Sequence, residues 1–290
     1  MKIKQIISIL VAIILLLTSV ATLTGITSNE GLESFSYQSI RGEEINIYGR
    51  GLYKHMSSDV AVQGIAQDYV TLLIGIPILL IAWLYYQRGS YKGQLVLAGA
   101  LLYFLVTYLF YLSMGMYNEL FLVYTGLLAT SFFGVILTIY QLGQSKLDQL
   151  FIKVKLYQYA ASFVTINCLL IAIMWLGIIV PPLISGEIYP TQLQHYTTLI
   201  VQGFDLGLLL PIGFALSYLT FKKQPQGYLG ITIYLVFLSL LMLALTSKVL
   251  FMWRDGQNVV PVIFIMPLIS LIAGLFSFNI IKNLQNVSKI

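Results

Sequence analysis

Residues 120–140 read LFLVYTGLLATSFFGVILTIY and carry no charged side chain. A helix needs about 20 apolar residues to cross the hydrocarbon core of a bilayer, and this run has that length. Because lipid offers the backbone no hydrogen-bonding partner, such a segment must satisfy its own N–H and C=O groups as a helix. Seven further apolar runs of similar length, two of them with a single charged residue, occupy residues 6–26, 69–86, 94–113, 157–180, 201–221, 228–250 and 259–281. The sequence therefore predicts an all-α fold, a polytopic membrane bundle of eight transmembrane helices.

The composition leaves little room for structure outside the membrane. Of 290 residues, 58% are hydrophobic and 9% are charged, whereas soluble domains carry about 25% charged residues. Only residues 27–66 form a long stretch without a predicted helix, which excludes a separate soluble catalytic domain. We expect a single membrane domain, 1–290, whose first half-bundle (1–150) includes that outer loop and whose second half-bundle is 151–290. The one cysteine, Cys168, lies within a predicted helix, so neither a disulfide framework nor a cysteine-based metal site can form within the chain.

The first apolar run has two interpretations. Lys2 and Lys4 before an apolar segment, with the small residues Ser19, Val20 and Ala21 further on, are also typical of a cleaved secretory signal. The apolar stretch continues past that point, which favours a retained membrane anchor.

The distribution of basic residues predicts the orientation, because Lys and Arg stay on the cytoplasmic side of a membrane. With the N-terminus inside, eleven of the sixteen basic residues are cytoplasmic: Lys2, Lys4, Arg88, Lys92, Lys146, Lys153, Lys155, Lys222, Lys223, Lys282 and Lys289. Asp148 is then the only cytoplasmic acid, and both histidines lie outside. We predict a plasma-membrane protein with both termini cytoplasmic. Since its basic residues are scattered over short loops, the net charge of +5 does not indicate a nucleic-acid partner.

A short internal match relates the two halves of the chain. Residues 62–68 read VQGIAQD and residues 201–205 read VQGFD, and each segment leads into an apolar run that contains a proline, Pro77 or Pro211. This pattern predicts two four-helix repeats of the same orientation. Coincidence between apolar segments of low complexity is the alternative.

The acids that end these two segments, Asp68 and Asp205, are the leading candidates for a binding site. An aspartate at a helix start can simply cap free N–H groups. An ionisable group near the bilayer instead marks a functional site that faces the bundle interior. Two such carboxylates around one cavity would suit a cation or a protonated amine, with the neighbouring amides Gln63, Gln67 and Gln202 as further ligand-binding candidates.

Two outer histidines extend this site to a metal hypothesis. His55 precedes Asp68 and His195 precedes Asp205, so the four side chains would offer nitrogen and oxygen ligands for a divalent metal. A metal-activated water would then permit a hydrolytic or transfer reaction. The alternative is a pair of solvated loop histidines.

Tyrosines cluster in and after the third apolar run. Tyr108 and Tyr111, followed by Asn118 and Glu119, either belong to an aromatic belt at the headgroup level or form one wall of a ligand site. Lys248, near the outer end of the seventh run, is expected to extend its ammonium towards the interface.

Several of these segments resemble an uncharacterised group of bacterial multispanning membrane proteins. They are residues 67–77 (QDYVTLLIGIP), 88–93 (RGSYKG), the tyrosine-rich stretch 103–111 and residues 117–122 (YNELFL). The resemblance covers roughly the second to fourth helices and implies bacterial origin and a multispanning fold, but no mechanism. Thr107 departs from the asparagine of that group.

The sequence leads to three functional hypotheses. The first is an outward-facing polar cavity that binds or transports a small molecule or cation, lined by Asp68 and Asp205. The second is a membrane-embedded hydrolase or transferase acting at the outer leaflet. The third is a structural or sensory envelope component.

Overall fold

The computed structural model describes residues 2–145, 147, 151, 154–187 and 189–284 of the chain. Four residues that entered the predicted orientation, Lys146, Asp148, Lys153 and Lys289, lie outside the described residues. Within the described part, eight helices are long and apolar enough to cross a membrane, which confirms the predicted bundle. The chain is a polytopic membrane protein whose outer surface contacts the lipid bilayer.

The eight membrane spans follow the predicted order, and two of them are interrupted. The six uninterrupted spans are α1 (Ile3–Thr27), α4 (Tyr91–Met114), α5 (Phe121–Gly143), α7 (Val154–Ser185), α10 (Pro225–Arg254) and α11 (Val262–Lys282). The second span consists of α2 (Ser58–Val70), the π-helix η1 (Thr71–Gly75) and α3 (Ile76–Gln87). The sixth consists of α8 (Ile200–Phe204), the π-helix η3 (Asp205–Leu209) and α9 (Leu210–Phe221).

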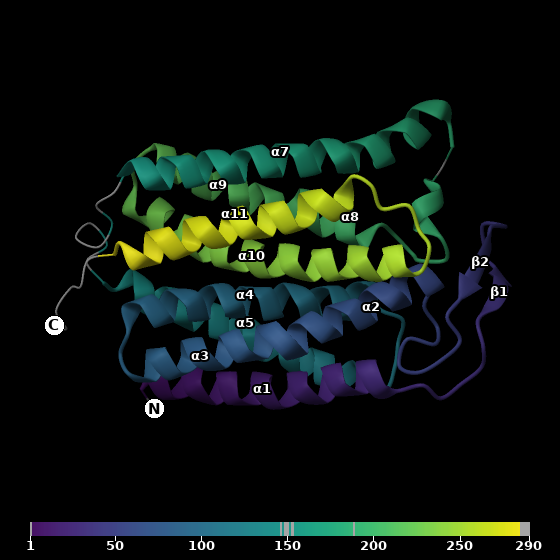
Figure 1. Ribbon diagram of the computed structural model, residues 1–290, viewed down its shortest axis with the longest axis horizontal. Coiled ribbons are helices and arrows are strands. Elements are labelled where there is room, and N and C mark those ends of the chain that lie inside the picture. The colour runs from purple at the N-terminus through teal and green to yellow at the C-terminus, as the bar shows by residue number, and fades with distance from the viewer. Residues whose placement is uncertain (1, 146, 148–150, 152–153, 188, 285–290) are drawn as a thin grey trace.

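The second span begins earlier than predicted. α2 starts at Ser58, so the loop after α1 covers residues 28–57 and not 27–66. This loop contains a β-hairpin of two antiparallel strands, β1 (Phe35–Gln38) and β2 (Glu44–Ile47), in which Phe35 pairs with Ile47. Figure 1 shows the hairpin at the end of the bundle opposite to the start of α1 and the end of α11. We call these the hairpin end and the terminal end. The orientation in a membrane stays a prediction.

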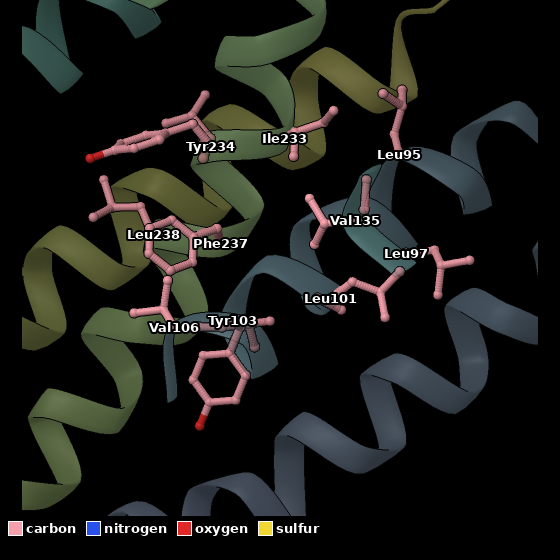
Figure 2. Close-up of a cluster of buried hydrophobic side chains, with 14 of the residues drawn as sticks. Leu95, Leu97, Leu101, Tyr103, Val106, Val135, Ile233, Tyr234, Phe237 and Leu238 are labelled. Atoms are coloured by element: carbon pink, nitrogen blue, oxygen red, sulfur yellow. The ribbon is translucent and has the colours of Figure 1, made fainter. Parts of the chain in front are cut away.

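The centre of the bundle is formed by α4 and α10, which are the most deeply buried of the eight spans. Figure 2 shows side chains of α4, α10 and the neighbouring α5 packed together, with the ring of Phe237 between Leu238 and Val106. At the crossing of α4 and α10, a β-carbon on Gly99 would lie 2.5 Å from Cβ of Val236 and 2.9 Å from the carbonyl oxygen of Ile233. A residue without a side chain is therefore required there, as is typical of closely packed membrane helices.

Replacement of Gly99 by alanine is expected to destabilise the folded protein by about 1 to 3 kcal/mol, because the added methyl group overpacks the α4–α10 contact. The measurement is the thermal unfolding midpoint in detergent. Gly203→Ala on α8 is the matched control, since its β-carbon would meet no atom within 4 Å. Equal midpoints for the two variants would contradict the close packing of α4 and α10.

Both interrupted spans carry the same irregularity. Pro77 and Pro211 each follow the first residue of their helix, and a π-helix of five residues precedes each. Proline cannot donate to the carbonyl four residues earlier and crowds it. In each π-helix, the N–H of the following residue instead reaches back five residues, from Ile76 to Thr71 and from Leu210 to Asp205. Such segments are rare and often occur at functional sites.

Counted back from the prolines, the two acids are not equivalent. Asp205 occupies the position of Thr71, which is three residues beyond Asp68 (71 − 68 = 3). The helix contacts within the halves do correspond, since α4 contacts α3 and α5 as α10 contacts α9 and α11. The four-helix repeat stays a prediction, and the expected equivalence of the two acids is not seen.

Candidate functional site

Asp68 lies inside α2, on the face turned towards α1 and α4, and its side chain is 2% exposed. Asp68 is the eleventh residue of α2, so it does not cap the helix. The Tyr53 hydroxyl donates a short hydrogen bond to its Oδ2, and the Tyr111 hydroxyl donates to its Oδ1 over 2.8 Å. Both carboxylate oxygens thus have a donor, as a buried carboxylate requires.

The donor Tyr53 comes from the loop between the hairpin and α2. Burial, and the adjacent carboxylate of Asp68, raise the pKa of the Tyr53 hydroxyl well above its ordinary value, so it stays protonated and available as a donor. Tyr111 also donates to the carbonyl of Gly64 over 3.1 Å. The acid is therefore held by one residue of the hairpin-end loop and one residue of α4.

Gly25 of α1 completes the surroundings of Asp68. A β-carbon at this position would overlap with Oδ2 of Asp68 and lie 2.9 Å from the Tyr53 hydroxyl. Any side chain here would displace the carboxylate or its donor. We call Gly25, Tyr53, Asp68 and Tyr111 the acid cage.

A chain of buried polar groups continues from the acid cage towards the middle of the bundle. The amide of Gln67 donates to the Tyr103 hydroxyl over 2.8 Å and to Thr107 over 3.3 Å. Thr71 is 2.8 Å from the same tyrosine hydroxyl. Thr107 thus has a polar role although it departs from the asparagine expected from the resemblance.

Next to the acid cage is a cavity of about 420 Å³ between the two halves of the bundle. It is bounded by α2 and α4 on one side and by α7, α8 with η3, α10 and α11 on the other. Tyr53 and Tyr111 separate Asp68 from the cavity, so Asp68 does not line it as predicted. The polar side chains on the wall are Tyr53, Gln63, Gln67, Thr107, Tyr111, Trp175, Asp205, Tyr234, Lys248 and Asn258.

Asp205 does line the cavity, as predicted. It is the first residue of η3, and the indole N–H of Trp175 on α7 donates to its Oδ2 over 2.7 Å. No donor among the described residues reaches its other oxygen, Oδ1. One side of this carboxylate is therefore fixed to α7 and the other is available to a ligand.

Lys248 of α10 is the cation of the site. Its side chain lines the cavity, and it interacts electrostatically with both Asp68 and Asp205. No hydrogen bond or ion pair joins its ammonium to any residue that the structure describes. The neighbouring Ser247 donates to the carbonyl of Ala66 over 3.2 Å, which fixes α10 against α2 at this level. The expectation that Lys248 extends towards the interface is therefore wrong.

The remaining predicted ligand residues lie elsewhere. Gln202 is on α8 but does not line the cavity. Tyr108 is buried against the rings of Tyr111 and Tyr124. Asn118 accepts from the backbone N–H of Leu120 over 2.9 Å, and Glu119 pairs with Lys54 over 3.6 Å at an exposed position.

The four side chains of the metal hypothesis are not brought together. His195 bonds through its ring to the carbonyl oxygen of His55 over 3.3 Å, and burial lowers the pKa of the His195 ring. Asp68 and Asp205 are held by the tyrosine and tryptophan donors described above. Among the residues that the structure describes, no three His, Cys, Asp or Glu side chains could hold a metal ion.

Sequence reasoning missed the contributions of Gly25, Tyr53, Trp175 and Lys248. A lysine within an apolar run is a signal that could have identified Lys248, because charged residues within membrane helices mark functional sites. The other three are brought to the site only by helix packing. Searches against protein-family models, curated proteins and solved structures found no match to this chain.

Proposed function

We propose that this protein binds a small molecule in the cavity, with the polar part of the ligand against Lys248 and Asp205. The observation that carries the proposal is Lys248, which lines a cavity of about 420 Å³ and whose ammonium has no hydrogen bond or ion pair to the described residues. A charge within a membrane helix costs free energy. A ligand that accepts hydrogen bonds would supply the missing partners.

The size and the wall of the cavity support this proposal. Ligand pockets commonly have volumes of about 300 to 1,000 Å³, with mostly apolar walls and a few converging polar groups. The cavity has these properties, and it lies between the two halves of the bundle, where a ligand can contact both.

The position of the cavity favours binding over the other hypotheses. Its described lining residues run from Asn258 at the hairpin end to Tyr234 and Leu210 near the middle of the bundle. In the predicted orientation this is an outward-facing site in a bacterial plasma membrane. Transport would need a second arrangement that opens the terminal end. Catalysis would need a nucleophile held by a base, and no hydrogen bond among the described residues joins Asp205 to a hydroxyl or an amine on the cavity wall.

A thermal-stability screen of purified protein tests the proposal. We expect at least one compound from a library of amphipathic acids, amines and amino acids to raise the unfolding midpoint by several degrees, because a ligand stabilises the state that binds it. Lys248→Met should lose this shift. Lys222→Met, which changes an exposed lysine at the terminal end, should keep it. A library without any effect, or equal shifts in all three proteins, would contradict binding in the cavity.

A further inference from the structure

Two charged groups on the cavity wall each have a hydrogen-bonding position that no described residue fills. The Lys248 ammonium offers three N–H donors, and none has an acceptor among the described residues. Asp205 accepts from Trp175 at Oδ2, but no donor from the described part of the chain reaches Oδ1. Asp68 differs, because each of its carboxylate oxygens accepts a hydrogen bond from a tyrosine hydroxyl and because it does not line the cavity.

The charges of the wall restrict the ligand that would fill these positions. A ligand with only a cationic group could pair with Asp205, but it would leave Lys248 without an acceptor and place a second positive charge near it. A ligand with only an anionic group could pair with Lys248, but it would leave Oδ1 of Asp205 without a donor and place a second negative charge near it. A group with both charges satisfies both residues and adds no net charge to a cavity within the membrane, where an uncompensated charge is costly.

The apolar residues of the cavity wall indicate what the uncharged part of the ligand is like. Six of the seven methionines that the structure describes line this cavity: Met56, Met114, Met174, Met242, Met252 and Met266. Methionine is unbranched and polarisable, and it is frequent on surfaces that adapt to apolar partners of variable shape. A wall of this kind suits a flexible apolar body.

We propose that the ligand is a zwitterion, with an ammonium group and an anionic oxygen group close together on a flexible apolar body. The anionic group contacts Lys248 and the ammonium contacts Oδ1 of Asp205, while the apolar body lies against the methionines. This inference rests on the proposed function, because it names the class of molecule that the same cavity takes.

The test uses four single-chain probes of equal chain length that differ only in the head group: an amine, a carboxylate, an alcohol and an α-amino acid. Each probe is brominated on its chain, and bromine quenches the fluorescence of a tryptophan that it contacts. Trp175 lines the cavity. A Trp83→Phe, Trp253→Phe background therefore leaves one reporter at the site.

Lipid nanodiscs carry the protein, and probe affinity is taken from the quenching of Trp175. The control is a protein that keeps only Trp253, whose side chain is 62% exposed and reports probe dissolved in the bilayer. We expect the α-amino acid to bind at least about tenfold more tightly than the amine or the carboxylate, which corresponds to about 1.4 kcal/mol.

Two variants separate the contributions of the charged groups. In Lys248→Met, the amino acid should lose its advantage over the amine, because the partner of its anionic group is gone. In Asp205→Asn, it should lose its advantage over the carboxylate. Each variant should retain the other preference, which a general loss of folding would not produce.

The outcomes distinguish the two proposals. In the protein that keeps Lys248 and Asp205, the amine, the carboxylate or the alcohol could quench Trp175 as strongly as the amino acid does. The zwitterion inference would then be wrong, while binding in the cavity would stand. Loss of both preferences in either variant would also overturn it. If no probe quenches Trp175 more than Trp253, the proposed function itself is wrong.

Discussion

Gly25→Ala is expected to destabilise the folded protein by about 3 to 5 kcal/mol. The new methyl group would occupy the place of Oδ2 of Asp68 and crowd the Tyr53 hydroxyl. Overpacking of a buried site costs about 1 to 3 kcal/mol. The displaced carboxylate would in addition lose a hydrogen bond, and bonds to charged groups contribute about 1.5 to 3 kcal/mol. The thermal unfolding midpoint of the purified protein measures the effect.

The control for this prediction is the same substitution where space is available. Gly177 on α7 is exposed, and its β-carbon would meet no atom within 4 Å. Gly177→Ala should leave the midpoint unchanged or raise it slightly, because alanine has the higher helix propensity. A Gly25→Ala protein as stable as Gly177→Ala would show that the acid cage is not closed by α1.

Asp68→Leu should also destabilise the protein strongly, by about 3 kcal/mol. Leucine has the same branched shape at Cγ but is larger and accepts no hydrogen bond, so the Tyr53 and Tyr111 hydroxyls lose their acceptor. A buried donor without a partner costs about 1 to 3 kcal/mol. Tyr111 can still donate to the carbonyl of Gly64, whereas the remaining neighbour of Tyr53 is the Tyr111 hydroxyl, 3.4 Å away. Tyr53 should therefore account for most of the loss.

A double-mutant cycle assigns that loss to the hydrogen bond. Tyr53→Phe and Asp68→Leu should couple by at least about 1 kcal/mol, because residues in contact are not additive. Tyr86→Phe provides the control, since its hydroxyl donates to Gln141 over 2.7 Å at the terminal end of the bundle. Tyr86→Phe should lower the free energy of unfolding by itself. In the double variant its effect and that of Asp68→Leu should add without coupling. If Asp68→Leu coupled equally with Tyr53→Phe and with Tyr86→Phe, the hydrogen bond between Tyr53 and Asp68 would not explain the loss of stability.

The sequence was sufficient to predict the eight membrane helices. Apolar length determines them, because a chain in lipid has few alternatives to the helix. The start of α2 was placed too late because residues 58–68 are mixed in polarity. They include Asp59, Gln63, Gln67 and Asp68, which are turned towards the bundle interior or its hairpin end. The hairpin at residues 35–47 was also missed, since a two-stranded unit of four-residue strands has only a weak periodic signal.

Several residues of the cavity wall were selected from the sequence, and ligand binding at them stays a prediction. Charge within or beside apolar runs was enough to select Asp68 and Asp205. Gln63 and Gln67 followed from their positions near Asp68, and Tyr111 from the tyrosine cluster of the third apolar run. The placement of Asp68 behind two tyrosines depends on how the 28–57 loop folds over the hairpin end, which local patterns do not encode. Lys248 was assigned to the interface by its distance along the helix alone. Its direction depends on the rotation of α10, which is set by contacts such as that of Val236 with Gly99.

The π-helices η1 and η3 make the number of residues between acid and proline a part of the site. An α-helix turns by about 100° per residue, and a π-helix accommodates an extra residue without breaking the span. Deletion of one residue from η1 would restore a regular helix. It would also rotate α2 relative to α3, and this rotation would turn Asp68 away from Tyr111. The same holds for Asp205 and Trp175 at η3. A redesigned protein that keeps every residue of this site but changes that spacing by one residue would therefore lose the arrangement of the side chains. An alignment that ignores the spacing would not detect this difference.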